Sequence, residues 1–332
     1  MGMIIDDTPG FDVVGDVHGM GRALVDLLRH LGYNDSSGYF AHPIRTAVFV
    51  GDLVDRGPEQ VLAVNTVRAM VEAGSAKMVL GNHELNAIHY VTRHRTEDRF
   101  LRPHTDHNDR QHRVYVDSVG FGSDEHCDMI EWFRSLPMWL ELELDGQKLR
   151  IVHAFWDPAS MQTLGDDPYL NDEVIHLSAR SGSPEYEAIE VLLKGPELRI
   201  EPPYFDKDGN RRPKARFKWW KPGASTVMDA IVMQPNVTAE DGSEWSLDDP
   251  DAPVLPPVEP YPDDAPPVLF GHYWRTGSPG TPESSNIACT DFSACKGGLL
   301  AAYRWSGEQT LVADNFSWLP RTDSVQAGRV SS

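Results

Sequence analysis

Three short polar motifs, each placed directly after an apolar run, constrain the fold of this chain more than any other feature. They are GDVHG at 15–19, GDLVDRG at 51–57 and GNHE at 81–84. Each motif is followed by a stretch with apolar residues at helical spacing. A buried strand, a tight glycine-rich loop and a helix, repeated along the chain, are typical of a mainly parallel sheet covered by helices. The N-terminal part of the chain therefore predicts an α/β fold.

The same patterns predict the boundaries of the elements. We expect strands at 11–15, 47–51 and 77–81, followed by helices at 20–33, 59–73 and 84–92. A further helix is expected at 128–136. The strands expected at 139–144 and 148–154 form a hairpin, because Asp145-Gly146 between them favours a tight type I′ turn. Closing strands are expected at 268–270, 299–305 and 310–313.

Two segments differ in composition from the rest and are expected to be insertions in a single domain spanning 1–332. Residues 93–114 are polar and rich in histidine, which predicts a surface or cap segment. Residues 240–267 hold nine acidic residues and eight prolines but no lysine or arginine, which predicts a long surface loop. Neither a second core nor an internal repeat is apparent in the sequence.

Composition excludes several classes of protein. The 332 residues carry a formal net charge of −20, which argues against general nucleic-acid binding. Three cysteines without a CxxC pair argue against a disulfide scaffold or a cysteine-rich zinc ribbon. Because no signal peptide or membrane-spanning stretch is apparent, we expect a cytoplasmic protein without a membrane partner. Its oligomeric state is left open.

Metal-ligating residue types follow the apolar runs at five places. Because the carboxyl ends of strands in an α/β fold converge on one crevice, these side chains are expected to meet there. Imidazole, carboxylate and amide oxygen together suit Mn²⁺, Fe or Zn²⁺. The candidate ligands outnumber those that one ion with an open position needs, so two ions that share a carboxylate fit better. The candidates are Asp16, His18, Asp52, Asn82, His153 and His272.

The three motifs together resemble the signature of the calcineurin-like metallophosphoesterases, and within them the phosphoprotein phosphatase superfamily. The resemblance is strong over residues 11–87 and resumes at His153, at Gly271-His272 and at 290–305. The C-terminal part is most similar to bacterial symmetrical dinucleoside tetraphosphatases and to small bacterial protein phosphatases. The resemblance implies an αββα sandwich, that is, two mixed sheets flanked by helices.

The resemblance also implies how the ligands divide between two ions. Asp16 and His18 would bind one ion and Asp52 would bridge both, whereas the second ion would be held by Asn82, His153 and His272. The expected cofactors are two divalent or trivalent ions, with Mn²⁺ the ion expected to support activity in vitro and Fe or Zn²⁺ as alternatives. A water molecule whose pKa the ions lower would attack phosphorus in line.

Three further roles are implied by the same motifs. His83 would protonate the leaving oxygen, and Asp55 would hold the His83 imidazole in its working tautomer. The planar guanidinium of Arg56 would grip phosphate oxygens, together with Asn82.

Additional phosphate contacts are expected from basic residues outside the motifs. Arg216 or Lys218, in the basic segment 206–221, is a candidate for a second phosphate clamp. The alternative for this segment is a solvated strand with Trp219 and Trp220 packed on the core. Arg275 is a further candidate. The histidines at 94, 104, 107 and 112 are expected on the solvated surface, and a third metal site is the alternative.

The expected activity is hydrolysis of phosphomonoesters, on phosphoproteins or a broader range of substrates. Hydrolysis of a phosphoanhydride in a dinucleoside polyphosphate is the alternative, so the expected partner is a phosphorylated protein or a nucleotide. Two positions differ from the pattern of many relatives. His153-Ala154-Phe155 stands in place of His-Ala-Gly, where the phenylalanine is expected to narrow or reshape the site. Thr290-Asp291-Phe292 stands in place of Asp-Thr-Gly.

Overall fold

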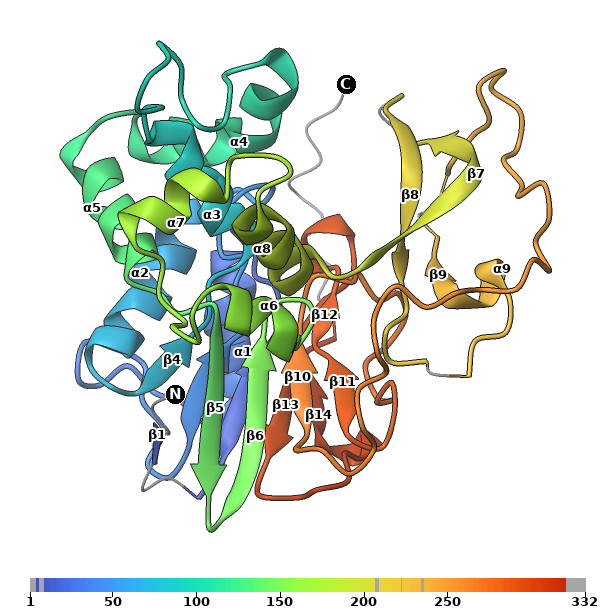
Figure 1. Ribbon diagram of the computed structural model, residues 1–332. Helices are drawn as coiled ribbons and strands as arrows, with labels where there is room; N and C mark the ends of the chain where they lie inside the picture. Colours follow the sequence, from blue (N-terminus) through green and yellow to red (C-terminus); the bar gives the residue numbers. More distant parts are fainter. Residues whose placement is uncertain (1–3, 6–8, 207–208, 222, 234–235, 321–332) are drawn as a thin grey trace.

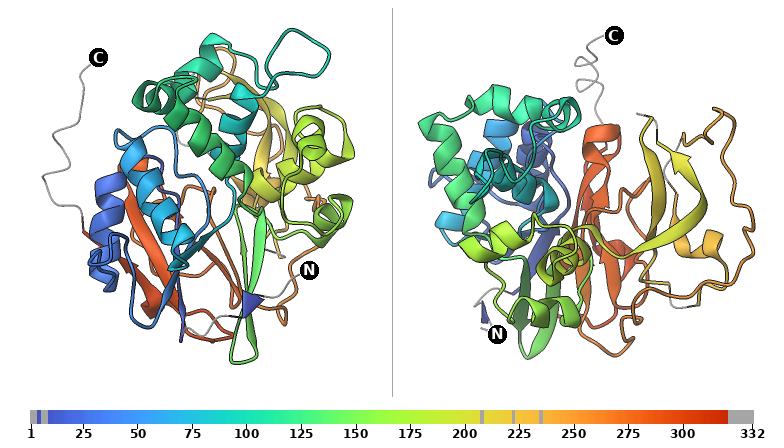
Figure 2. Two further views of the ribbon diagram at one scale, coloured as in Figure 1. Left: turned by 90° about the vertical axis from the view of Figure 1, so that its left-hand side faces the viewer. Right: turned by 45° about the horizontal axis from the view of Figure 1, so that its top comes forward.

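Two β-sheets stacked face to face form the body of the molecule, and helices cover their outer faces (Figures 1 and 2). This arrangement is seen in a computed structural model that describes residues 4–5, 9–206, 209–221, 223–233 and 236–320. The αββα sandwich expected from the sequence is confirmed. Among the described residues, no helix is both long and apolar enough to cross a bilayer.

The first sheet contains the strands that lead into the three polar motifs. Its strand order is β12-β13-β2-β3-β4, with β14 also paired to β13. The strands β2, β3 and β4 are parallel, and β13 runs antiparallel to β2. The bounds are β2 (Phe11–Val14), β3 (Thr46–Phe49), β4 (Ala76–Met78), β12 (Asp291–Phe292), β13 (Leu299–Trp305) and β14 (Phe316–Trp318).

The second sheet contains the strands that lead into His153 and His272. Its order is β1-β5-β6-β10-β11, in which β5 and β6 form the expected hairpin and β10 is parallel to β6. The bounds are β1 (Ile4–Ile5), β5 (Trp139–Leu144), β6 (Gln147–Val152), β10 (Val268–Phe270) and β11 (Ile287–Cys289).

The core between the two sheets is apolar and fully enclosed. Val13 and Val48 of the first sheet pack in one cluster with Leu142, Ile151 and Leu269 of the second. Neighbouring residues such as Val14 point to the opposite face and pack with the helices. Since both faces of these strands are buried, the strands are continuous apolar runs in the sequence, and this is why they could be predicted.

The helices lie mainly above and outside the strands, with α3, α4 and α5 towards the top of Figure 1. The α-helices are α1 (Gly21–Leu31), α2 (Gln60–Glu72), α3 (Asn82–Val91), α4 (Asp106–Val119), α5 (Asp124–Arg134), α6 (Pro158–Thr163), α7 (Asp172–Leu177), α8 (Pro184–Lys194) and α9 (Val227–Ala230). Two 3₁₀ turns occur at η1 (Ala294–Lys296) and η2 (Ala313–Asn315).

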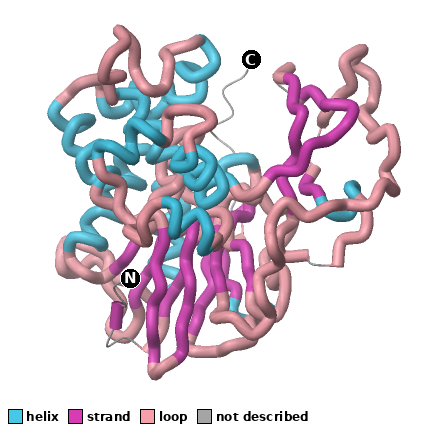
Figure 3. The backbone as a smooth tube through the Cα atoms, in the orientation of Figure 1, coloured by secondary structure: helices cyan, strands magenta, loops and turns pink. Residues whose placement is uncertain are grey.

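A small third sheet stands beside the body, to the right in Figure 1. It consists of β7 (Glu197–Phe205), β8 (Arg211–Phe217) and β9 (Ile231–Val232). Ile200, Tyr204 and Trp245 belong to an apolar cluster of its own, which the sequence did not reveal. Residues 240–267 form the long loop expected there, and Figure 3 shows this side of the molecule largely as loop.

One prediction of secondary structure was wrong. The strand expected at 310–313 is absent, because Leu311 donates its backbone N–H to the Ser285 carbonyl and the chain leaves β13 there. Pairing with β13 resumes only at Phe316. Residues 93–114, expected as a polar surface or cap segment, also contain the first turns of helix α4, which is capped by Thr105 and buries His112.

Candidate functional site

The six candidate metal ligands lie together at the carboxyl ends of strands from both main sheets. Asp16 and His18 follow β2, Asp52 follows β3, and Asn82 is the first residue of α3. His153 follows β6 and His272 follows β10. All six side chains are buried, with at most 8% of any residue exposed. The convergence expected from the strand ends is therefore what the structure shows.

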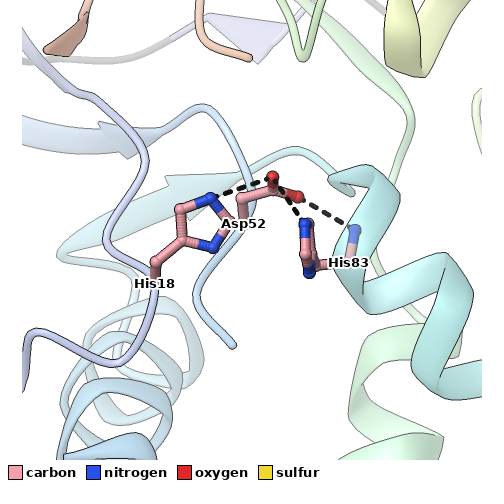
Figure 4. Close-up of side chains that lie close together, drawn as sticks. All are labelled: His18, Asp52 and His83. Carbon is pink, nitrogen blue, oxygen red and sulfur yellow. Dashed lines mark hydrogen bonds and ion pairs between the residues drawn. The ribbon is translucent and has the colours of Figure 1, made fainter. Parts of the chain in front are cut away.

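The carboxylate of Asp52 lies between two groups of histidines. Its Oδ2 atom is 3.5 Å from Nε2 of His18 and 3.9 Å from Nε2 of His83 (Figure 4). Its Oδ1 atom is 3.4 Å from Nε2 of His153. Two sets of donors spaced for metal binding result, one of His18, Asp52 and His83 and the other of Asp52, His153 and His272.

The two remaining candidates complete the ring around Asp52. Asp16 Oδ2 lies 3.9 Å from His18 Nε2, and the same carboxylate accepts the backbone N–H of His272 at 3.1 Å. Asn82 Oδ1 lies 3.2 Å from His153 Nε2. Carboxylate and amide oxygens and imidazole nitrogens from both sheets therefore face a common space.

Several imidazole nitrogens are arranged as metal ligands are. The Nδ1 atoms of His18 and His153 lie 2.9 and 2.7 Å from the backbone carbonyls of Val54 and Val50, an arrangement that directs each Nε2 to the interior. Nε2 of His18 and Nε2 of His272 are buried with no hydrogen-bond partner. Buried polar atoms seldom lack a partner, so this donor set fits cations.

The electrostatics of the carboxylates point the same way. Burial, followed by the nearby Asp291 and Asp52 carboxylates, raises the pKa of Asp16 well above its ordinary value. For Asp52, burial alone would raise the pKa, but the imidazoles of His153 and His83 outweigh it and lower the pKa. Buried carboxylates in such close array require positive charge, which a pair of metal ions supplies.

Backbone strain is concentrated at the site. Non-glycine residues rarely adopt positive φ, and such strain is typical of functional sites, where each case costs about 1–3 kcal/mol. The described residues with this conformation include six around the site, namely His18, Asp52, Asp55, Arg56, His272 and Trp274. The loops after β2, β3 and β10 are therefore held in unusual conformations that aim these side chains inward.

Glu84, the last residue of the GNHE motif, supports the loop that carries Asp52. Its carboxylate accepts the backbone N–H groups of Asp52 at 2.8 Å and Leu53 at 2.7 Å, and it also caps α3 through Gly81 at 3.1 Å. Burial and the Asp52 carboxylate raise the pKa of Glu84 to about 7. No local pattern in the sequence indicates this role for Glu84.

The three residues expected to act on the substrate are linked to one another. His83 Nδ1 lies 2.5 Å from Asp55 Oδ2. Because a guanidinium can only donate, the 3.2 Å contact between Arg56 Nη2 and His83 Nε2 makes that nitrogen an acceptor here. With Nδ1 then carrying the proton, Asp55 holds the tautomer and orientation of the imidazole.

His112, expected on the solvated surface, is a buried functional candidate. The residue is 2% exposed, and its Nδ1 lies 2.7 Å from Asp55 Oδ1. The expectation of a solvated histidine was wrong because α4 turns this side chain inward with Tyr115 and Val119. That helical spacing of 112, 115 and 119 is the signal that could have revealed it.

The outlying basic residues behave differently from one another. Arg216 on β8 donates to the backbone carbonyl of His272 at 2.9 Å and so borders the site, while Trp219 and Trp220 on the same segment are buried. Lys218 instead donates to the Asp229 carbonyl. Arg275 pairs with the buried Glu283 at 2.7 Å, which gives it a structural partner.

Phe155 does not narrow the site as expected. It is 3% exposed and packs on the ring of Trp219 in the core, with ring centroids 4.9 Å apart. A cavity of about 170 Å³ instead opens beside Asn82, between α3 and α8, and reaches Leu101, Tyr186 and Lys194. This cavity provides room for a bulky group next to the candidate metal ligands.

Comparison with known proteins agrees with this geometry. The family described as calcineurin-like phosphoesterase matches residues 10–211. A symmetrical bis(5'-nucleosyl)-tetraphosphatase of Erwinia tasmaniensis is 26% identical, over 90% of this chain and 95% of that protein. A similar relation, also at 26% identity, holds for the symmetrical enzyme of Proteus mirabilis, over 93% of this chain and 98% of that one.

Other similarities are more local or concern the fold alone. The asymmetrical tetraphosphatase PrpE of Halalkalibacterium halodurans is 45% identical over 22% of this chain, and the match spans only 30% of that relative. A yeast serine/threonine phosphatase with similarity to human PP5 shares the fold, with a TM-score of 0.51 at 15% identity. That match covers 97% of this chain and 84% of the yeast chain.

Proposed function

The chain belongs to the calcineurin-like phosphoesterase family, and we propose that it is a hydrolase of phosphoric esters or anhydrides that works with two metal ions. The observation that carries the proposal is Asp52, whose two carboxylate oxygens face separate histidine groups. A carboxylate in that position suits a bridging ligand.

We propose the following distribution of ligands for the two ions. Asp16 and His18 would hold one ion, Asn82, His153 and His272 the other, and Asp52 both. Bound there, the ions would lower the pKa of water and neutralise charge on the phosphoryl group. We propose Mn²⁺ as the ion that supports activity in vitro, with Fe and Zn²⁺ as alternatives.

The chain's own residues would orient the substrate and supply a proton. The planar guanidinium of Arg56 would bind non-bridging phosphate oxygens, and its contact with His83 Nε2 would then be broken. His83, held at Nδ1 by Asp55, would then take up a proton from solvent at the freed Nε2 and deliver it to the leaving oxygen. Asn82, which borders both His153 and the adjacent cavity, would position the phosphoryl group against the leaving group.

Two substrate classes remain in the proposal, and we place dinucleoside polyphosphates first. The relatives that align along nearly their whole length are named as symmetrical tetraphosphatases, and the cavity beside Asn82 offers space for part of a nucleoside. Phosphomonoesters, the class that the sequence favoured, are the second candidate. The resemblance supports this class through the glutamate that ends GNHE, where tetraphosphatases often have aspartate, and through the long insertions.

The test compares three substrates after chelation and addition of Mn²⁺: diadenosine tetraphosphate, para-nitrophenyl phosphate and a phosphopeptide. We expect metal-dependent turnover, with the highest kcat/KM for the tetraphosphate. His83→Asn is expected to lower the rate by about 10²–10⁴ while the bound metal content is retained. Full turnover by folded, metal-free protein, or an unchanged rate in His83→Asn, would contradict the proposal.

A further inference from the structure

Three cationic side chains gather around a single indole at the edge of the site. The Nζ atom of Lys296 lies 3.2 Å from the ring centroid of Trp274, and the guanidinium carbons of Arg216 and Arg56 lie 4.3 and 5.5 Å from it. The residues come from four separate segments of the chain. We call this group, Arg56, Arg216, Trp274 and Lys296, the cation cluster.

The three cations of the cluster outnumber the one carboxylate behind them, that of Asp291, which attracts all three. Within the described ranges, no carboxylate lies at ion-pair distance from Arg56, Arg216 or Lys296. Arg216 donates to a backbone carbonyl and Arg56 contacts His83 and the thiol of Cys295. Three mutually repelling cations in a chain of net charge −20 call for an anion that comes from outside.

The arrangement is held in place by a buried carboxylate. Asp291, 1% exposed, accepts the backbone N–H of Trp274 at 2.9 Å with one oxygen and that of Ser293 at 2.9 Å with the other. Ser293 begins the turn that carries Lys296, and both Ser293 and Trp274 have positive φ. The loops that bear the indole and the ammonium are therefore fixed together in strained conformations.

The cation cluster adjoins the candidate metal centre at two points. Arg216 donates to the carbonyl of His272, and Arg56 contacts Nε2 of His83. An anion bound between Arg216 and Lys296 would consequently lie next to a phosphoryl group held by Arg56. In a phosphoanhydride, the neighbouring phosphoryl group carries such a charge one bridging oxygen away.

We propose that Lys296, Arg216 and Trp274 form a subsite for the second phosphoryl group of a phosphoanhydride substrate. The inference rests on the proposed function and narrows it to substrates with a polyphosphate chain. Trp274 is not a stacking platform for a base in this arrangement, since cations already lie over its ring. Its ring holds the two cations in place by cation–π contacts before the anion binds.

The test is a comparison of Lys296→Ala with wild type on three substrates in excess Mn²⁺: diadenosine tetraphosphate, para-nitrophenyl phosphate and an acidic phosphopeptide. Losing a hydrogen bond to a charged group lowers affinity by about 10–100-fold. We therefore expect kcat/KM for diadenosine tetraphosphate to fall at least about tenfold further than kcat/KM for para-nitrophenyl phosphate. Lys296→Arg, which keeps the charge, should restore most of the difference. Lys148→Ala is the charge-matched control, because Lys148 lies on the distant β5–β6 hairpin and pairs with Glu141.

The outcomes separate this inference from the proposed function. An equal fall on both substrates, no fall on either, or a selective fall on an acidic phosphopeptide would overturn the subsite. If wild type hydrolyses none of the substrates, the proposed function fails. Calorimetric titration with inorganic tripolyphosphate and with orthophosphate then still tests the subsite. The subsite predicts that Lys296→Ala binds tripolyphosphate more weakly than wild type does, whereas orthophosphate binding is unchanged.

Discussion

The carboxylate of Asp55 is shared between two imidazoles, and its contact with His112 is a direct hydrogen bond of 2.7 Å. Its other oxygen lies 2.5 Å from His83. Burial by itself would raise the pKa of Asp55, but His112, and after it His83, hold that pKa well below its ordinary value. His112 therefore keeps Asp55 ionised and fixed, so that Asp55 can orient His83.

Replacing His112 by alanine should accordingly impair activity without touching the candidate metal ligands. We expect kcat/KM with para-nitrophenyl phosphate to fall by about 10–100-fold, the usual effect of removing an outer-shell partner. The metal content, measured by elemental analysis, should be unchanged. Because the Asp55 pKa would rise without His112, activity should also be lost at a higher pH on the acidic side of the profile.

The pH profile separates positioning of Asp55 from a merely structural role for His112. His107→Ala on the same helix serves as the control, since His107 contacts Gln111 at 2.9 Å and not Asp55. If the rate falls but the pH at which activity is lost on the acidic side stays the same, then His112 only packs α4 against the core. A rate equal to wild type would remove His112 from the mechanism altogether.

The parts of the molecule that sequence predicted best are those with local signals. The strands leading to Asp16, Asp52 and Asn82 are apolar runs ended by glycine, and their positions agree with β2, β3 and β4. Parallel strand ends converge for a topological reason, so the meeting of six distant side chains followed as well. The pairing of Asp55 with His83 was predicted only from the resemblance to the metallophosphoesterase signature.

The parts that sequence missed depend on contacts between distant segments. His112 and Asp55 are 57 residues apart, and nothing local in a polar segment distinguishes a buried histidine from a solvated one. Lys296 meets Trp274 only because Asp291 ties two loops together through backbone hydrogen bonds. The strand expected at 310–313 does not form because Leu311 donates a backbone hydrogen bond to Ser285. The alternation of apolar and polar residues along the sequence does not reveal such a contact.

Asp12 provides a test of stability at the end of β2 away from the site. Its carboxylate is fully buried and pairs with Arg45 at 2.7 Å and Arg304 at 3.1 Å, and it also accepts from Tyr33. Removing one member of a buried ion pair leaves an uncompensated charge, which costs about 3–5 kcal/mol. We expect Asp12→Ala to lower the free energy of unfolding by that amount in urea titrations.

The control for Asp12 is an exposed ion pair in the same part of the molecule. Asp35 pairs with Arg29 at 3.5 Å with both side chains largely in solvent, so Asp35→Ala should change stability far less. Equal effects of the two substitutions would show that the Asp12 network contributes no more than a surface pair.

Glu283 predicts how stability depends on pH. Its side chain is buried beside Arg275, and this burial raises its pKa from an ordinary value of 4.5 to about 7, although Arg275 opposes the shift. A carboxyl whose pKa is raised by folding stabilises the folded state below its unfolded pKa. That contribution is lost as the pH rises through the folded pKa, here between about 4.5 and 7.

Glu283→Gln removes this titration, since glutamine stays neutral and keeps the side-chain shape. Relative to the variant, wild type should lose stability from pH 5 to pH 8, by about 2–3 kcal/mol at most, because one pKa unit corresponds to about 1.4 kcal/mol. Urea titrations of both proteins at each pH, in chelator to remove metal binding from the comparison, measure the difference. The exposed Glu259→Gln should follow wild type. If Glu283→Gln follows wild type too, then the Arg275 ion pair keeps Glu283 charged, and its oxygens are better compensated than burial alone implies.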